Sequence, residues 1–252
     1  MTTSVSTDRP DPTTAPQGAG SDPTTASRLG RMALALLTAV VVGAVVSLVG
    51  LEAIDTVNWP AFNSSNVTRS LTTAGQVLAI AVLVVVALLY RYGKGRVFIP
   101  VLSAAAMSAF VTVTIGMPLG GATRLYLFGL SVDQEFRTEY LTRMTSSLRL
   151  ADMTYPDLPP YYPAGWFWWG RSVRESARPA RVGGLQAWAI VSMAVAAAVG
   201  VILFNRMFGA DRGVALGLAV TTMALLYASP EPYAAILVIV GVPMMIVLTY
   251  AL

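Results

Sequence analysis

The sequence is dominated by long apolar runs that contain no charged residue. Six of them follow one another along the chain: Met32–Leu51, Leu71–Tyr90, Val97–Thr123, Val182–Asn205, Gly213–Pro230 and Pro232–Leu252. A helix needs roughly 20 apolar residues to cross the hydrocarbon core of a bilayer. Backbone groups find no water there, so they must be satisfied within helices. The sequence therefore predicts an all-α integral membrane protein with six transmembrane helices, of which the fifth is the shortest.

The composition agrees with a chain whose main solvent is lipid. It is 55% hydrophobic with a mean hydropathy of +0.64. A net charge of +4 would suggest nucleic-acid binding in a soluble chain, but here the basic residues flank apolar runs, where they act as topology signals. We therefore predict no nucleic-acid partner. The chain has no Cys and no His, so acid–base chemistry is left to carboxylates, Tyr, Lys or Arg.

The basic residues beside the apolar runs predict the orientation in the membrane. Three groups lie on one side of the predicted helices: Arg28 and Arg31; Arg91, Lys94 and Arg96; and Arg206 and Arg212. The positive-inside rule makes that side cytoplasmic. We therefore expect a multi-pass protein of the plasma membrane with a cytoplasmic N-terminus and a long extracytoplasmic segment, Ser131–Arg181.

Composition also divides the chain into two regions. Residues 1–27 are rich in Thr, Pro, Ser, Asp and Gly and cannot bury enough apolar surface to offset their ordering entropy, which predicts a disordered cytoplasmic tail. Residues 28–252 form a predicted polytopic membrane domain. The last apolar run reaches Leu252 without a polar flank, which we interpret as a truncated part of a longer membrane protein.

Ser131–Arg181 is the one long polar interval between apolar runs, with six of the thirteen acidic and seven of the seventeen basic residues. Ser131-x-x-Gln134 fits a capping box, which predicts a helix from there to about Arg149. Its expected apolar face is Phe136, Tyr140, Leu141, Met144 and Leu148. Asp133 and Arg137 fall on that same face, whereas Glu135, Glu139 and Arg143 point to water. The segment thus predicts an amphipathic helix with two charges on its buried side.

Two interpretations of Asp133 and Arg137 are open. The two side chains could form an i,i+4 ion pair that only braces the helix. Alternatively, Asp133 could take a proton from an attacking hydroxyl at the membrane surface, while Arg137 holds a phosphate.

Other polar and aromatic groups have a structural and a functional interpretation as well. Asp152 and Asp157 flank Tyr155-Pro156, which favours a turn. Trp166-Phe-Trp-Trp169 is typical of an interfacial anchor and alternatively of a sugar platform. Glu231 lies between two prolines, where it could cap a helix or complete a site.

Several strings resemble one known family. They are Asn58-Trp-Pro-Ala-Phe, Gly116-Met-Pro-Leu-Gly, Leu125-Tyr-Leu-Phe-Gly, Ser131-Val-Asp-Gln-Glu-Phe-Arg-Thr-Glu-Tyr-Leu-Thr-Arg143, Asp152-Met-Thr-Tyr, Leu158-Pro-Pro-Tyr-Tyr-Pro-Ala-Gly-Trp-Phe-Trp and Ser229-Pro-Glu-Pro-Tyr-Ala-Ala. Together they resemble the N-terminal membrane part of the galactan 5-O-arabinofuranosyltransferases of the mycobacterial and corynebacterial cell wall. The resemblance covers roughly Arg28 to Leu252.

The resemblance implies a GT-C-like glycosyltransferase of arabinogalactan biosynthesis. Its donor would be decaprenylphosphoryl arabinofuranose in the membrane lipid, and its acceptor the galactan chain. A carboxylate would deprotonate the galactosyl 5-hydroxyl, which displaces the polyprenyl phosphate with inversion. Charge on that phosphate would need Arg, a divalent cation or both. Family members continue with further spans and a soluble C-terminal domain, so this chain alone is expected to be inactive.

The predicted site lies mainly in the long polar segment. Asp133 and Glu135 are the candidate catalytic carboxylates, and the candidate substrate contacts are Arg137, Tyr140, Arg143, Asp152, Tyr161, Tyr162, Trp166 and Glu231. GT-C enzymes usually place a catalytic acid in the first outward loop, which here offers only Glu52 and Asp55. The alternative function is a non-catalytic lipid-binding or scaffold module that recruits a glycosyltransferase. A transporter ranks lower, because no run carries a charge near its centre.

Overall fold

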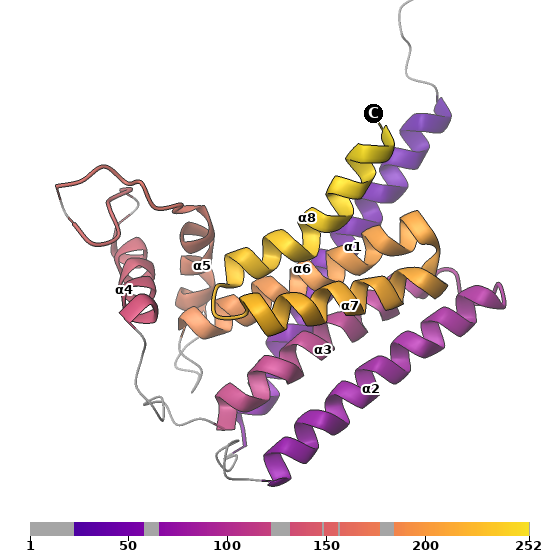
Figure 1. Cartoon of the computed structure of the whole chain (residues 1–252), viewed down its shortest axis with the longest axis horizontal. Helices are drawn as coiled ribbons and strands as arrows, with labels where there is room; N and C mark the ends of the chain where they lie inside the picture. Colours follow the sequence, from indigo (N-terminus) through magenta and orange to yellow (C-terminus); the bar gives the residue numbers. More distant parts are fainter. Residues whose placement is uncertain are drawn as a thin grey trace, which may run out of the picture. The chain divides into compact units, whose positions relative to one another are not determined.

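Every regular element that the structure describes is an α-helix (Figure 1). The computed structural model describes residues 23–57, 66–121, 132–147, 149–155, 157–176 and 184–251. Its helices are α1 (Pro23–Asp55), α2 (Asn66–Arg91), α3 (Ile99–Gly121), α4 (Val132–Ser146), α5 (Gly165–Ser176), α6 (Gly184–Phe208), α7 (Ala210–Ala228) and α8 (Pro232–Ala251). The all-α prediction is confirmed for these residues, among which there is no β-strand.

The chain divides into two units within α1. The first ends at Leu34 and the second comprises Ala35–Leu252. In the first unit α1 begins at Pro23, well before the first apolar run at Met32. Proline is accepted in the first turn of a helix, where no backbone N–H is needed. The helix start therefore overlaps the end of the tail predicted over residues 1–27, of which residues 1–22 lie outside the described part.

The central helix of the second unit is α6. It contacts α3, α7 and α8 and buries most of its apolar side chains. The stretch from Ala194 to Gly200 is rich in small residues, which let helix backbones approach closely. On α7, a Cβ added to Gly213 would lie 2.5 Å from the Cα of Asn205 on α6. Small residues therefore set the distance between α6 and α7.

Polar side chains inside this apolar bundle form hydrogen bonds between helices. Ser108 on α3 donates to the carbonyl of Gly43 on α1 at 2.7 Å. Gln76 on α2 donates to Thr114 on α3 at 3.0 Å. Asn205 on α6 donates to Ser103 on α3, also at 3.0 Å. Such bonds are typical of helices that meet in lipid, because water is absent and each polar group needs a protein partner.

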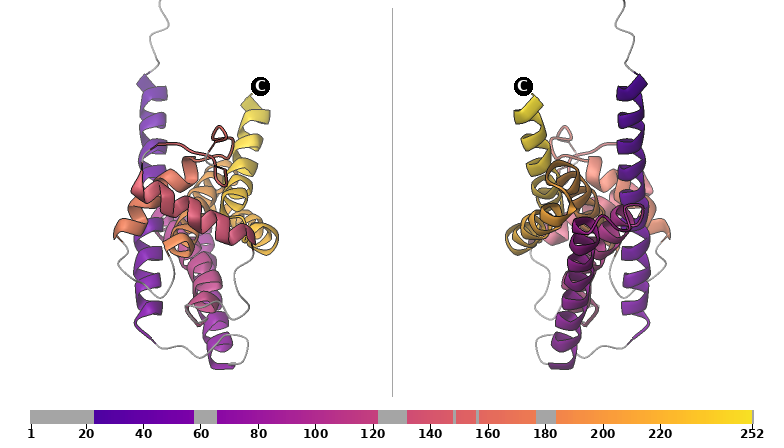
Figure 2. Two further views of the ribbon diagram at one scale, coloured as in Figure 1. Left: turned by 90° about the vertical axis from the view of Figure 1, so that its left-hand side faces the viewer. Right: turned by 90° about the vertical axis from the view of Figure 1, so that its right-hand side faces the viewer.

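The helices α4 and α5 pack against each other, and α5 packs against α6 (Figure 2). The buried side chains of α4 recur at helical spacing, namely Arg137, Tyr140, Leu141 and Met144. Tyr140, Leu141 and Met144 form one apolar cluster with Phe167 on α5 and Leu185 on α6. The predicted amphipathic helix is confirmed, although it ends at Ser146 rather than near Arg149. Ser131 and Leu148 lie outside the described residues.

Five helices are long and apolar enough to cross a membrane, by length and composition: α1 from Ser27, α2, α3, α6 and α8. The helix predicted over Gly213–Pro230 is present as α7 but falls outside this group. Its first turn contains Asp211 and Arg212, which shorten the apolar part of a helix of 19 residues. An integral membrane protein is thus supported, while the sixth span remains a prediction.

Candidate functional site

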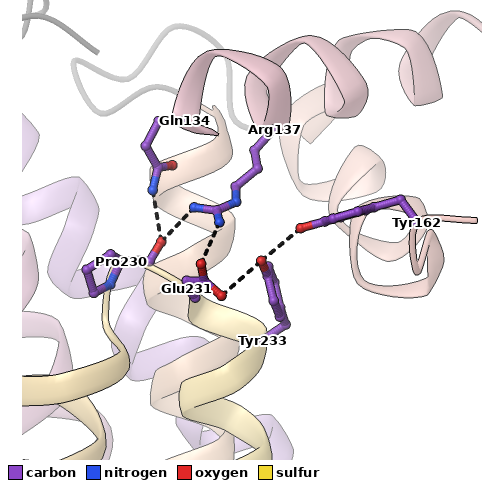
Figure 3. A network of polar contacts seen from close by, with 6 residues as sticks. All are labelled: Gln134, Arg137, Tyr162, Pro230, Glu231 and Tyr233. Carbon is purple, nitrogen blue, oxygen red and sulfur yellow. Dashed lines mark hydrogen bonds and ion pairs between the residues drawn. The ribbon is translucent and has the colours of Figure 1, made fainter. Parts of the chain in front are cut away.

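The centre of the candidate site is Arg137, a buried arginine on the apolar face of α4. Only 6% of its surface is exposed. Its Nη2 lies 2.8 Å from Oε1 of Glu231, and its Nη1 donates to the carbonyl of Pro230 at 3.1 Å. Gln134, one turn earlier on α4, donates to the same carbonyl at 2.8 Å (Figure 3). A buried charge is tolerated only with such partners, so this contact ties α4 to the turn between α7 and α8.

The prediction that Asp133 lies on the buried face of α4 is wrong, and the i,i+4 pair with Arg137, one of the two open interpretations, does not form. Asp133 is exposed, and the ion pair of Arg137 is with Glu231. The buried residues of α4 begin at Arg137, one turn after Asp133. Glu135 and Glu139 are exposed, as predicted. On that outer side Arg143 pairs with Glu139 at 2.7 Å.

A line of hydroxyl groups continues from Glu231. Tyr233 donates to Oε2 of Glu231 at 3.2 Å, and the hydroxyls of Tyr233 and Tyr162 lie 2.8 Å apart. Because the Tyr233 proton goes to the carboxylate, Tyr162 is the donor in the second bond. The ring of Tyr233 also lies 5.7 Å from the guanidinium carbon of Arg137. Both oxygens of Glu231 are therefore engaged, one by a cation and one by a phenol (Figure 3).

The surroundings of Arg137 favour its charged form. Burial would lower the pKa of its guanidinium, but Tyr162, Tyr233 and Glu231 together outweigh burial and hold that pKa above its ordinary value. One donor is left over, because the buried Nε of Arg137 has no hydrogen-bond partner among the described residues. An unmet buried donor costs about 1–3 kcal/mol. An acceptor that reached Nε would remove that cost.

Arg137 and Gln134 line a cavity of about 560 Å³. The polar end is completed by the turn residues Ser229 and Pro230. Its other walls come from α2, α3, α5, α6, α7 and α8 and are mostly apolar, with Phe110, Trp166, Met193 and Leu226 among them. The cavity thus combines one buried guanidinium with mostly apolar walls, which suits a molecule with an anionic head and a hydrocarbon tail.

An aromatic cluster stands beside the cavity. It consists of Tyr140, Tyr162, Trp166, Phe167, Trp188 and Tyr233, most of them meeting edge to face. The indole nitrogen of Trp166 donates to Ser192 at 3.2 Å, and that of Trp188 donates to the carbonyl of Trp166 at 2.9 Å. Burial raises the pKa of the Tyr140 hydroxyl, which has no hydrogen-bond partner among the described residues. These contacts fix Trp166 in the cavity wall.

The carboxylate of Asp152 is held by the backbone of a turn. Its Oδ2 accepts from the backbone N–H groups of Thr154 and Tyr155, both at 2.8 Å, which closes a turn. These bonds lower the pKa of the Asp152 carboxyl below its ordinary value. Arg143 reaches the backbone carbonyl of Asp152 at 3.4 Å. The turn interpretation therefore accounts for the contacts of Asp152.

The structure brings together only some of the residues predicted for the site. Arg137, Tyr140, Tyr162, Trp166 and Glu231 meet, although Glu231 comes from a turn far along the chain. The remaining predicted residues lie outside this group: Asp133, Glu135 and Tyr161 are exposed, and Arg143 and Asp152 support a turn. The described residues contain no group of three acidic side chains able to hold a metal ion.

Two contributors were missed at the sequence level. The capping box indicates only a helix start for Gln134, whereas its amide reaches Pro230. The sequence indicates no role for Tyr233 beyond its place in the Ser229-Pro-Glu-Pro-Tyr string, whereas it links Glu231 to Tyr162. The signal for Tyr233 was its position two residues after a carboxylate in a proline-bounded turn.

Comparison with known proteins confirms the resemblance. The chain is 49% identical over 217 residues to a galactan 5-O-arabinofuranosyltransferase of Mycobacterium tuberculosis, covering 86% of this chain and 33% of that protein. It is 44% identical over 216 residues to the protein so named from Mycobacterium leprae, covering 86% and 34%. With the one from Corynebacterium glutamicum it shares 39% over 246 residues, covering 88% and 36%.

This chain spans about a third of the length of the curated relatives it matches. The part it covers is their N-terminal part. A family described as "Arabinofuranosyltransferase N terminal" matches residues 35–252, which include the whole cavity and the Arg137–Glu231 contact. The chain therefore belongs to the arabinofuranosyltransferase N-terminal family.

Proposed function

We propose that this chain is the donor-binding membrane part of an arabinofuranosyltransferase that moves arabinofuranose from a polyprenyl phosphate to galactan in arabinogalactan biosynthesis. The observation that carries the proposal is a cavity lined by a buried guanidinium and by mostly apolar helix surfaces. Decaprenylphosphoryl arabinofuranose, the donor that the family resemblance implies, has matching chemistry: a phosphodiester next to a long hydrocarbon chain.

The phosphate of the donor would lie against Arg137. Guanidinium groups bind phosphate with two parallel hydrogen bonds, and Arg137 has an unmet Nε donor beside its two engaged nitrogens. Glu231 and Pro230 hold the guanidinium in place before any ligand arrives, which reduces the ordering cost of binding. The isoprene units would then pack along the apolar walls that α3, α6 and α7 provide.

We infer a single displacement with inversion at the anomeric carbon. A carboxylate takes the proton of the galactosyl 5-hydroxyl, the oxygen bonds to the anomeric carbon, and the bond to the phosphate oxygen breaks. Polyprenyl phosphate then leaves with the electron pair, and Arg137 stabilises its charge. Asp133 is our proposed base, with Glu135 beside it, because its carboxylate makes no ion pair among the described residues and lies one turn from Arg137.

Arg137→Lys in the full-length enzyme tests the donor site. Lysine keeps the charge but loses the planar fork, so we expect donor affinity to fall about 10-fold or more. Arg143→Lys is the matched control, because Arg143 lies on the same helix in an exposed pair. Binding of radiolabelled decaprenylphosphoryl arabinofuranose gives the affinity, and thermal unfolding in detergent shows that each variant folds. Equal affinities in folded Arg137→Lys and Arg143→Lys would contradict the proposed site.

The alternative is a non-catalytic lipid-binding module that recruits a glycosyltransferase. The same cavity favours it, because an apolar cavity with a cationic end binds a lipid phosphate whether or not transfer follows. In the full-length enzyme the two proposals predict different effects of Arg137→Lys on the rate of transfer at saturating donor. A slower transfer at saturation supports a role in the reaction, and a weaker donor affinity with an unchanged saturated rate supports the module.

A further inference from the structure

We propose a second anion site at the other end of the helices, which takes a phosphate group and whose expected occupant is the headgroup of an anionic phospholipid. A cavity of about 760 Å³ lies where α2 ends, α3 begins, α6 ends and α7 begins. Its volume is within the range of about 300–1,000 Å³ typical of small-molecule pockets. Arg91, Arg96 and Arg206 line it.

These three arginines come from different segments. Arg91 is in the last turn of α2, Arg96 follows in the connection to α3, and Arg206 is in the last turn of α6. None of them has a carboxylate within ion-pair distance in the part of the chain that the structure describes. One acidic residue, Asp211, also lines the cavity, so its lining carries more positive than negative charge. Such an arrangement attracts a multivalent anion.

Polar and backbone groups add to this preference. The first turns of α3 and α7 both open on the cavity, through Ile99, Pro100, Ala210 and Asp211. Helix N-termini carry partial positive charge and favour anions. Gly209 joins α6 to α7 with a φ of +83°, and a Cβ there would lie 3.0 Å from the ring of Tyr90. Because Tyr90 lines the cavity, this connection lies close to the cavity wall. The cavity is therefore a defined concave site rather than a scatter of surface charges.

The position of the cavity favours a lipid as the source of the phosphate. Three helices of membrane-spanning length, α2, α3 and α6, have their ends there, so the cavity lies at the depth where phospholipid headgroups are found. It is at the opposite end of these helices from the Arg137 cavity. Basic pockets between membrane helices are a known type of site for anionic headgroups. This site is independent of the proposed transferase reaction.

Lipid binding to the whole 252-residue chain in neutral detergent tests the site. The probes are dioleoyl phosphatidylglycerol, dioleoyl phosphatidylcholine and inorganic phosphate, and native mass spectrometry counts bound molecules. Arg91→Gln with Arg206→Gln should weaken phosphatidylglycerol binding at least about 10-fold, since each lost arginine removes charge-assisted hydrogen bonds. The matched control is Lys94→Gln with Arg212→Gln, which removes the same charge from exposed residues that do not line the cavity.

The outcomes separate the possibilities. The site with a lipid occupant is supported if the chain binds phosphatidylglycerol selectively, Arg91→Gln with Arg206→Gln loses this binding, and Lys94→Gln with Arg212→Gln keeps it. Phosphatidylglycerol displaced by millimolar inorganic phosphate, again only with the native arginines, supports the same site with free phosphate as its ligand. Equal losses in both double variants, or no preference for either phosphate probe over phosphatidylcholine, would overturn the proposal. Arg96→Gln serves as a second variant if the double variant does not fold.

Discussion

Arg137 shows how one buried charge is kept in an apolar face. Its partners are the Pro230 carbonyl and the Glu231 carboxylate in the turn before α8, together with the ring of Tyr233. Asp133 has the opposite environment, since its carboxylate is exposed and makes no ion pair among the described residues. The bracing interpretation therefore fails for Asp133, and its role as a base can be tested without the loss of a structural contact.

Asp133→Asn in the full-length enzyme is the test at this scale. We expect transfer to a galactan acceptor to fall at least about 100-fold, the lower end of general-base catalysis. Donor binding and thermal unfolding should stay close to those of the unmodified enzyme, because the substitution removes no ion pair of the structure. Glu139→Gln, another exposed carboxylate of α4, is the control. Near-normal transfer by folded Asp133→Asn would move the base assignment to Glu231, Glu135 or Asp55.

At the scale of helices, close backbone packing holds the bundle together. Gly213 on α7 faces Asn205 on α6, and the atoms that a Cβ would meet are the main-chain N and Cα of Asn205 and its side-chain oxygen. Backbone atoms within a helix cannot move aside as a flexible side chain does. By contrast, a Cβ added at Gly241 on α8 would meet nothing within 4 Å.

Gly213→Ala and Gly241→Ala are therefore expected to differ in stability. Gly213→Ala should lower the free energy of unfolding by about 1–3 kcal/mol, the usual cost of overpacking. Gly241→Ala should leave it unchanged or raise it by less than about 1 kcal/mol, because alanine restricts the unfolded chain more than glycine. Unfolding by sodium dodecyl sulfate in mixed micelles, followed by circular dichroism, measures both. A Gly213→Ala variant as stable as Gly241→Ala would show that α6 and α7 are not in close backbone contact.

At the scale of the whole molecule, the two cavities lie at opposite ends of the same helices. The basic residues around the second cavity are those that the positive-inside rule assigns to the cytoplasm. On that assignment α4, α5 and the Arg137 cavity face outward. A lipid-linked donor in the outer leaflet would then meet the cavity that has the apolar walls.

Single cysteines test this orientation in a chain that has none of its own. A cysteine at Ser147, exposed just after α4, should react with a membrane-impermeant thiol reagent in intact cells. One at Lys94, in the connection between α2 and α3, should react only after the membrane is permeabilised. Both cysteines should react equally in detergent, which controls for accessibility. The reverse pattern would invert the proposed topology and place the Arg137 cavity on the cytoplasmic side.

The sequence by itself determined the family and every described helix except α5, which it did not predict. Apolar runs of bilayer length predict α1, α2, α3, α6 and α8, and helical spacing predicts the buried side of α4, because these patterns depend on residues a few positions apart. Asp211 and Arg212 in the first turn of α7 are also visible in the sequence. They precede the apolar run Gly213–Pro230, which is the shortest of the six.

Only the tertiary structure decided the partner of Arg137. The bond to Glu231 joins residues 94 positions apart, and no local periodicity encodes which turn lies opposite a given helix face. Within α4, spacing alone placed Asp133 on the same face as Arg137, yet the buried residues of α4 begin at Arg137 and Asp133 is exposed. The same holds for the second cavity, whose three arginines are brought together by the ends of separate helices. Local sequence fixes which residues can be buried, and the packing of distant elements decides what they meet.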